Sequence, residues 1–171
     1  MSDEKLNVLL VCTGNTCRSS MAGALLKKIA GEDEVRVTSA GTAAFEGMGA
    51  SQGAIQALEE KGIDLKAHRA RRLTPEMVAA ADLVLTMERK HKKLVLDLVP
   101  PAREKVFTLK EFAGAPGGMP EDIADPFGGS LEVYRSTAEE IEKFLNLAHE
   151  KLKDWRRKAR TKEGKDRDVE K

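Results

Sequence analysis

The segment LNVLLVCTGNTCRS, residues 6–19, decides the fold. It opens with an apolar run that is too short for a helix and that precedes a Thr-Gly turn signal, which indicates a buried parallel strand. From Arg18 the apolar residues take helical spacing until Gly31, and residues 35–39 are typical of a second strand. The opening of the chain is therefore predicted to be a βαβ unit.

Strands and helices continue to alternate along the chain. We expect helices over residues 52–61 and 89–98 and strands over 82–86 and 105–109, while Thr74-Pro75 supplies an N-cap and a first-turn proline. Such alternation predicts an α/β fold in which helices cover a parallel sheet.

The last helix has the clearest period, with apolar residues from Tyr134 to Trp155 in alternating steps of four and three. This seam fits a coiled coil or a long helix packed on the sheet, and its length of about three heptads favours the packed helix. Residues 159–171 are charged and nearly free of apolar side chains. We expect them to form a disordered tail behind a single domain at 1–158.

The composition fits one globular domain. The 171 residues are 41% hydrophobic and 33% charged, and the formal net charge of +1 argues against a nucleic-acid or membrane partner. Two cysteines cannot make a disulfide scaffold, and no apolar N-terminal run resembles a signal peptide. We expect a cytoplasmic monomer.

The segment between Cys12 and Arg18 has the features of an anion site. Ligands bind at the carboxyl ends of strands in α/β sheets, and free N–H groups at a helix start attract negative charge. Five residues are enough for a loop whose amides surround one tetrahedral oxyanion, and Gly14 and Asn15 tolerate a left-handed backbone. The planar fork of Arg18 suits two phosphate oxygens.

Cys12 lies at the bottom of this predicted loop, where the field that attracts phosphate also stabilises a thiolate. Ser19 can donate a hydrogen bond to the sulfur. Asp125 lies in a Gly- and Pro-rich loop, where its carboxyl group suits either acid–base catalysis or a turn before Pro126. These parts suit catalysis through phosphocysteine; the alternative is a buried cysteine with an arginine at the surface.

The octapeptide CTGNTCRS, residues 12–19, resembles the phosphate loop of low-molecular-weight protein tyrosine phosphatases, and more closely that of their bacterial protein arginine phosphatase branch. The resemblance implies a flavodoxin-like three-layer fold with a four-stranded parallel sheet flanked by helices. It also implies phosphatase chemistry on phosphorylated proteins without a metal or a cofactor. Further matching segments are SAGT (39–42), DLVLTM (82–87), FTLKE (107–111) and DPFGGS (125–130).

The resemblance assigns three catalytic roles. Cys12 is the nucleophile, Arg18 binds the phosphoryl group, and Asp125 is the general acid and then the base that activates water. Ser19 assists the sulfur. The residues implied to contact the substrate are Thr13, Gly14, Asn15, Thr16, Cys17, Ser19 and Phe127.

Two residues are implied to brace the loop and two depart from the family pattern. Asn15 and Ser39 support the loop through hydrogen bonds. Ser20 stands where the family usually has proline, and Gly23 where an acidic residue is common. Ser20 reduces the preorganisation of the helix start but leaves every catalytic atom in place.

Thr16 and Phe127 bear on the choice of substrate. The tyrosine-specific branch usually has a bulky aliphatic residue at position 16, whereas threonine resembles the arginine phosphatases. Asp125 can pair with a guanidinium and Phe127 can stack on it. We therefore predict phosphoarginine as the substrate, and the alternative is a tyrosine phosphatase. If Thr16 is only a loop residue and Phe127 only covers the core, neither residue distinguishes the two substrates.

Cys17 has two interpretations. It can form a disulfide with Cys12 under oxidation, which would protect the sulfur and switch activity off, or it can be a small buried filler.

Rival functions have less support. Thioredoxin-coupled arsenate reductases share the fold and loop but need further cysteines downstream, and none follows Cys17. A phosphate-binding module without turnover would not need the whole catalytic set. His68, His91 and His149 lack metal-ligand spacing and are expected at the surface. The basic run 68–72 either attracts acidic phosphoproteins or is simply solvated.

Overall fold

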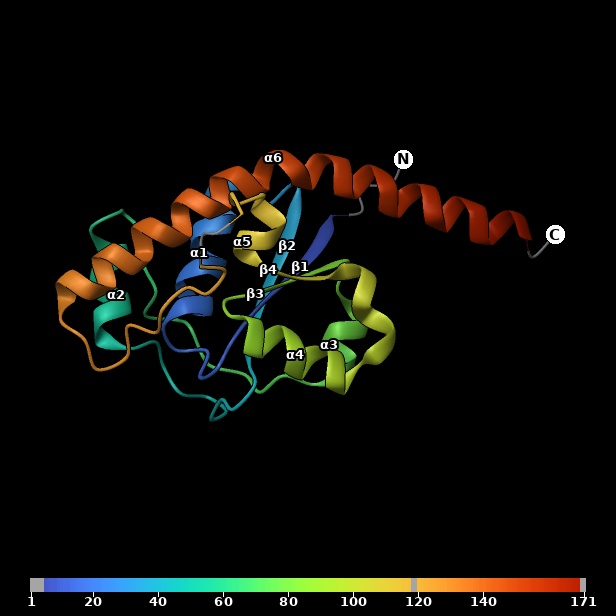
Figure 1. Ribbon diagram of the computed structural model, residues 1–171. Coiled ribbons are helices and arrows are strands. Elements are labelled where there is room, and N and C mark those ends of the chain that lie inside the picture. Colours follow the sequence, from blue (N-terminus) through green and yellow to red (C-terminus); the bar gives the residue numbers. More distant parts are fainter. Residues whose placement is uncertain (1–4, 118–119, 170–171) are drawn as a thin grey trace.

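The middle layer of the molecule is a four-stranded sheet, which the computed structural model shows with strand order β2-β1-β3-β4 (Figure 1). The structure describes residues 5–117 and 120–169. All three neighbouring pairs are parallel, which confirms the predicted fold class. The strands are β1 (Leu6–Cys12), β2 (Val35–Gly41), β3 (Leu83–Thr86) and β4 (Val106–Thr108).

The two faces of the sheet carry separate hydrophobic cores. Along β1, Val8 and Leu10 belong to the larger core, while Leu9 and Val11 belong to the smaller one. Successive side chains of a strand point to opposite faces, and here both faces are covered. This double burial explains why β1 has a continuous apolar run rather than an alternating pattern.

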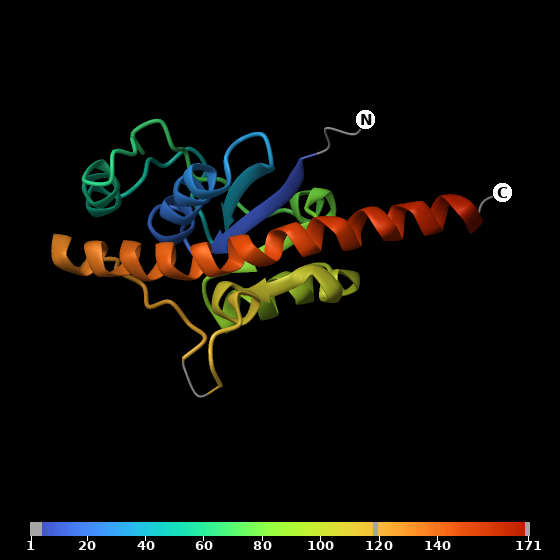
Figure 2. The ribbon, with the colours of Figure 1, turned by 90° about the horizontal axis from the view of Figure 1, so that it is seen from above.

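Helices form the two outer layers (Figures 1 and 2). The larger core contains side chains of α1 (Arg18–Ala30), α2 (Gln52–Glu59), α5 (Leu109–Ala113) and α6 (Leu131–Val169). The smaller core contains those of α3 (Pro75–Ala80), α4 (Arg89–Leu98) and the short 3-10 helix η1 (Pro100–Lys105).

The predicted element boundaries differ from the structure mainly around β4. The sequence predicts a strand to Leu109, but β4 ends at Thr108 and α5 begins at once. The Thr108 hydroxyl accepts a hydrogen bond from the backbone N–H of Glu111, which is a helix N-cap contact. This capping explains why the strand ends at Thr108 and why the short helix α5 follows, which the sequence pattern does not predict.

The seam of α6 is used inside this chain, which confirms the packed helix over the coiled coil. Ile141 and Leu145 are fully buried in the larger core. The helix then continues beyond the body of the molecule to Val169 (Figure 2). The predicted disorder from residue 159 is therefore wrong for the backbone up to 169, because Lys, Arg and Glu are strong helix formers that extend a helix already anchored in the core. Residues 170–171 of the predicted tail lie outside the described residues.

Parallel topology brings the ends of β1, β2 and β3 to one edge of the sheet. Just beyond the strand ends, Thr42 N–H donates to Cys12 O and Met87 N–H to Val11 O, at 2.9 and 3.0 Å. Ile123 N–H in turn donates to Met87 O at 2.9 Å, which fastens the loop before α6 to this edge. Three segments far apart in sequence therefore meet where the sequence predicts an anion site.

Candidate active site

The predicted phosphate loop joins the carboxyl end of β1 to the start of α1. Cys12 is the last residue of the strand and Arg18 the first of the helix, and both are almost completely buried. Asn15 has a φ of 57°, the left-handed conformation that asparagine tolerates better than most residues. This tight turn folds the loop back over its own nucleophile.

The sulfur of Cys12 receives two polar contacts. The backbone N–H of Asn15 points at Sγ from 3.2 Å, and Ser19 Oγ lies 2.9 Å away. The amide of Asn15 donates to Ser19 Oγ at 2.8 Å, so the hydroxyl proton of Ser19 is free to point at the sulfur. Both contacts place a hydrogen-bond donor against the sulfur.

Asn15 holds the loop through all of its polar atoms. Its amide nitrogen donates to Ser19 Oγ and to Ser39 Oγ, at 2.8 and 2.9 Å, and its amide oxygen accepts from Arg71 N–H at 3.0 Å. The expected contact between Asn15 and Ser39 is therefore present. A buried polar side chain with its hydrogen bonds satisfied fixes one geometry.

The structure adds His68 to this bracing. Its Nε2 lies 2.6 Å from the carbonyl oxygen of Asn15, which can only accept, so Nε2 carries the proton. Burial lowers the pKa of His68, against the opposing effect of this hydrogen bond, with Lys27 and Arg69 lowering it further. The expected surface position is wrong for this half-buried ring.

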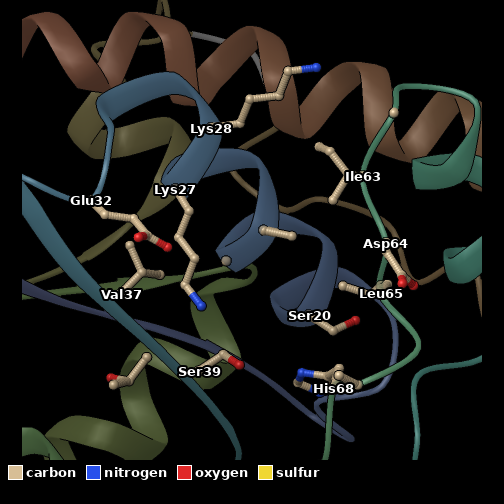
Figure 3. Close-up of a pocket in the computed structure, with 15 residues that line it drawn as sticks. Ser20, Lys27, Lys28, Glu32, Val37, Ser39, Ile63, Asp64, Leu65 and His68 are labelled. Carbon is tan, nitrogen blue, oxygen red and sulfur yellow. The ribbon is translucent and has the colours of Figure 1, made fainter.

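A cavity of about 740 Å³ lies behind the loop, between α1, β2 and the segment after α2 (Figure 3). Ser20, Ser39 and His68 line its end nearest the loop, and Lys27 reaches into it. Ser39 and His68, which contact Asn15 of the loop, therefore border this cavity on one side.

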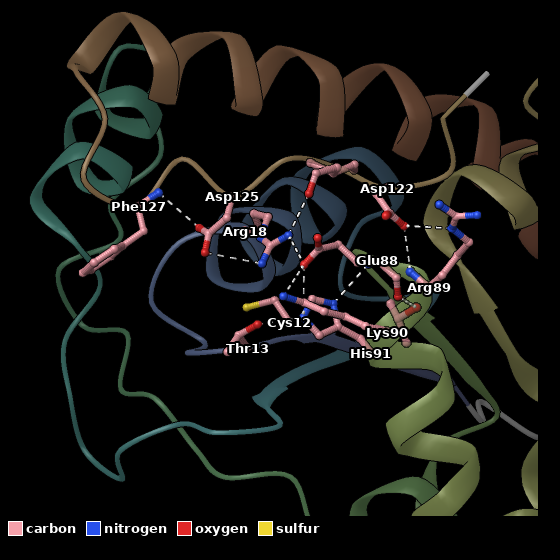
Figure 4. Close-up of polar contacts among 12 residues, drawn as sticks. Cys12, Thr13, Arg18, Glu88, Arg89, Lys90, His91, Asp122, Asp125 and Phe127 are labelled. Carbon is pink, nitrogen blue, oxygen red and sulfur yellow. Dashed lines mark hydrogen bonds and ion pairs between the residues drawn. The ribbon is translucent and has the colours of Figure 1, made fainter.

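Arg18 is oriented by two acceptors of the protein. Its Nη1 donates to the carbonyl oxygen of Ile123 at 2.7 Å and meets Glu88 Oε2 at 2.8 Å (Figure 4). The Ile123 carbonyl takes one proton of Nη1 and Glu88 forms an ion pair with the same nitrogen, so a phosphate is expected to meet Nε and Nη2. Sequence reasoning missed Glu88, although its place just after β3, at the carboxyl edge of the sheet, was an available signal.

Asp125 forms the predicted turn and lies beside Arg18. Its Oδ1 accepts from Phe127 N–H at 3.1 Å, which is an aspartate turn, and its Oδ2 lies 3.7 Å from Arg18 Nη2. About half of the Asp125 side chain is exposed, and the Phe127 ring is exposed at the rim of the site (Figure 4). The interpretation of Phe127 as a core cover is therefore wrong.

Thr16 and Cys17 close the loop toward the helices. Thr16 is half-buried and its carbonyl oxygen accepts from Ser51 N–H at 2.9 Å. Cys17 is buried, and its Sγ lies 3.2 Å from Ser51 Oγ and 3.4 Å from Tyr134 Oη. Burial and the contact with Cys17 raise the pKa of Tyr134. Both cysteines are free thiols.

Gly41 is a further residue that the loop requires. A Cβ at this position would collide with the carbonyl oxygen of Thr13 and crowd Asn15 N. The end of β2 can therefore approach the loop only because residue 41 has no side chain.

His91 is the largest departure from the sequence analysis at this site. It is completely buried in the first turn of α4, where the sequence predicted a surface residue, because β1 and β3 are neighbours and α4 starts against the phosphate loop. Its Nε2 lies 2.8 Å from Thr13 Oγ1. The third histidine, His149, is half-buried on α6, with Nε2 3.4 Å from a carboxylate oxygen of Glu34.

The described residues contain neither a membrane-spanning helix nor a cluster of metal-ligating side chains. No helix within 5–117 and 120–169 is long and apolar enough to span a membrane. Among those same residues, no group of three or more His, Cys, Asp or Glu side chains is arranged to hold a metal ion.

Comparison with known proteins identifies the family. Residues 7–158 match the family model described as low molecular weight phosphotyrosine protein phosphatase. A protein-arginine-phosphatase of Geobacillus stearothermophilus is 48% identical over 147 residues, which cover 85% of this chain and 95% of that protein. One of Bacillus subtilis is 44% identical over 154 residues, covering 89% of this chain and 100% of the relative.

A solved structure supports the same assignment. The YwlE arginine phosphatase, in a mutant with a phosphorylated active-site serine, superposes with a TM-score of 0.81 at 43% identity and covers 89% of this chain and 99% of its own. The range matched by the family model, residues 7–158, includes the phosphate loop and the loop of Asp125. The chain belongs to the low molecular weight phosphotyrosine protein phosphatase family.

Proposed function

We propose that this protein is a cysteine-dependent protein arginine phosphatase that works through a phosphocysteine intermediate. The observation that carries the proposal is the convergence of the Cys12 sulfur, the Asn15 N–H and the Arg18 guanidinium at one loop, with Thr16 in that loop. The relatives named as protein-arginine-phosphatases, at 44% and 48% identity, support the same substrate.

The first step breaks the P–N bond of phosphoarginine. Arg18 and the amides of residues 13–17 hold the phosphoryl oxygens while the Cys12 thiolate attacks phosphorus. Asp125, half exposed and beside Arg18, donates its proton to the departing guanidine nitrogen. The products of this step are an unphosphorylated arginine side chain in the protein substrate and a phosphocysteine at residue 12 of the enzyme.

The second step restores the enzyme. Asp125, now a carboxylate, takes a proton from water, and the oxygen of that water attacks phosphorus. The S–P bond breaks, and the Ser19 hydroxyl stabilises the leaving thiolate from 2.9 Å. Inorganic phosphate departs and Asp125 holds the proton that the next turnover needs.

Substrate choice rests on Thr16, Asp125 and Phe127. A small hydroxyl side chain at position 16 leaves room for a planar guanidinium, Asp125 can pair with its charge, and the exposed ring of Phe127 can stack on it. The alternative is a protein tyrosine phosphatase, which the family description itself names.

Turnover on matched peptides tests the proposal. Peptides that carry phosphoarginine, phosphotyrosine or phosphoserine in one sequence context are compared by kcat/KM, and the phosphoarginine peptide is expected to be far the best. Thr16→Ile should shift the preference toward phosphotyrosine. Equal rates on the first two peptides, or a preference for phosphotyrosine in the unaltered protein, would remove the arginine assignment and leave the alternative.

We also propose that Cys12 and Cys17 form a disulfide under oxidation, with peroxide taking up the two electrons and becoming water. Cys17 would have to leave Ser51 and Tyr134 to do so, since its Sγ contacts both. Mass spectrometry after mild peroxide treatment checks this. Sulfinic acid at Cys12 together with a free Cys17 would reject the switch in favour of the buried filler.

The remaining expectations concern the setting of the enzyme. We propose a single phosphatase domain at 1–158 that acts as a monomer on phosphorylated proteins in the cytoplasm. Two free thiols are typical of a reducing compartment, which supports this location. Size-exclusion chromatography with light scattering, and fractionation of the source cells, test the two statements.

A further inference from the structure

His91 is a completely buried histidine beside the phosphate loop that no step of the proposed reaction uses. It lies in the first turn of α4, between Thr13 of the loop and Glu88, the residue whose carboxylate meets Arg18 (Figure 4). A ring in this position contacts the loop on one side and the partner of the phosphate-binding arginine on the other.

The hydrogen bonds fix which nitrogen of His91 carries the proton. The backbone N–H of Glu88 donates to Nδ1 at 3.1 Å, so Nδ1 is an acceptor without a proton. The neutral ring therefore carries its proton on Nε2, which donates to Thr13 Oγ1 at 2.8 Å. Thr13 is an acceptor in this pair, and its own hydroxyl proton is directed away from the ring.

The surroundings keep the ring neutral. Burial lowers the pKa of His91 to about 4, and the charges of Arg18 and Lys90 act in the same direction against the opposing carboxylates of Glu88 and Asp122. The single-proton form and its two directed hydrogen bonds therefore persist at neutral pH.

We propose that His91 is a positioning residue that keeps the first residue of the phosphate loop in register with the carboxylate that orients Arg18. Thr13 follows the nucleophile directly, so a shift of Thr13 displaces the amides that face the phosphoryl oxygens. Glu88 fixes Nη1 of Arg18 at 2.8 Å, so a shift of Glu88 rotates the edge that grips phosphate. This role rests on the proposed phosphatase function and adds a residue to it.

Two substitutions separate the two hydrogen bonds of the ring. In His91→Asn the side-chain oxygen can replace Nδ1 as the acceptor for Glu88 N–H, but the chain is too short to reach Thr13. In His91→Gln the side-chain nitrogen can replace Nε2 as the donor to Thr13, while the acceptor for Glu88 is lost. Thr13→Val removes the same contact as His91→Asn from the opposite side.

We expect His91→Asn and Thr13→Val each to lower kcat about five- to tenfold with a small change in KM, as the loss of one hydrogen bond implies. The double variant, His91→Asn with Thr13→Val, should be no slower than either single variant, because all three variants lose the same hydrogen bond between residues 91 and 13. His91→Gln keeps the contact with Thr13 but loses the one with Glu88, so it should also lower kcat, by a smaller factor than His91→Asn, and show a lower Tm. His149→Gln, on α6 at the other edge of the sheet, is the matched histidine control and should behave as the unaltered protein.

Inhibitors distinguish positioning from loss of structure. The inhibition constant of orthovanadate, which adopts a transition-state-like geometry, should rise in His91→Asn by the same factor as kcat falls, whereas that of inorganic phosphate should change less than twofold. Unchanged kcat and vanadate inhibition in both His91→Asn and Thr13→Val would overturn the proposal, as would fully multiplicative effects in the double variant. If His91→Asn fails to fold, Thr13→Val alone decides.

The same assays separate this inference from the proposed function. An unaltered protein without phosphatase activity on any of the peptides would refute the function itself. An active unaltered protein whose variants match it in kcat and in vanadate inhibition would refute the role of His91 alone.

Discussion

The two flanks of the phosphate loop are built from different chemistry. On one flank, which we call the amide flank, Asn15, Ser19, Ser39 and His68 form uncharged hydrogen bonds and the Asn15 side chain is fully buried. On the other, the charged flank, Arg18 faces Glu88 and the half-exposed Asp125. The difference indicates that one flank holds the sulfur still, while the other binds charge and moves protons.

The largest effect is expected where the two flanks meet, at Cys12. Cys12→Ser should lower kcat by about 10⁴-fold or more, because a serine hydroxyl is a far weaker nucleophile at neutral pH. The unfolding free energy should change by no more than about 1 kcal/mol, since the two side chains are similar in size. Steady-state kinetics measures the loss of kcat, and urea unfolding measures the change in unfolding free energy. Substantial residual activity would show that another residue is the nucleophile.

The next largest effect should come from the charged flank. Asp125→Asn should lower kcat on phosphoarginine about 100- to 1000-fold, because the leaving guanidine then departs without a proton donor. On para-nitrophenyl phosphate, whose leaving group needs little protonation, the first step should suffer much less. Equal losses on both substrates in kcat/KM, which reports the first step and not the hydrolysis of phosphocysteine, would show that Asp125 acts on the loop rather than on the leaving group.

The amide flank should show its importance in stability as well as in rate. Asn15→Ala removes the three side-chain hydrogen bonds and should cost about 3 kcal/mol of unfolding free energy. Ser39→Ala, which removes only one of them, should cost about 1 kcal/mol. Chemical unfolding measures both; similar losses in the two variants would mean that Asn15 is not the centre of this flank.

The smallest effect on activity concerns pH and His91. Because its folded pKa of about 4 lies below the unfolded value of about 6.5, the unfolded chain binds a proton first as the pH falls. Stability should thus decline between pH 6.5 and 4, by up to about 3 kcal/mol from this group, and His91→Gln should flatten that part of the curve. An identical pH dependence in the variant would show that His91 does not titrate in this range.

The sequence predicted the contiguous part of the amide flank, residues 12–19, better than the contacts between distant segments on either flank. The strand β1, the loop and the start of α1 are contiguous, so one pattern contains their geometry, and Asn15 needs its residue type for the backbone it adopts. Glu88 and His91 reach the site only because β3 lies beside β1, and strand order follows from packing of the whole sheet. Metal-ligand spacing carries no information on His91, because this histidine contacts Thr13 of the loop and the backbone of Glu88.

Other misses have local causes. The apolar residue Leu109 after Thr108 makes the sequence pattern predict a longer β4. The Thr108 hydroxyl ends the strand instead, because it caps the helix that follows. The charged composition of residues 159–169 predicts disorder, but a helix anchored upstream needs no apolar face to continue.

The hydrogen bonds of Asn15 have a consequence for how a newly made chain acquires reactivity. One side chain ties together residues that lie in three separate parts of the polypeptide, at positions 15, 39 and 71. During synthesis, the chain must therefore emerge from the ribosome at least as far as residue 71 before the loop around Cys12 can form all of these contacts. Until that closure, the Cys12 sulfur is not held against the two donors that contact it in the folded protein.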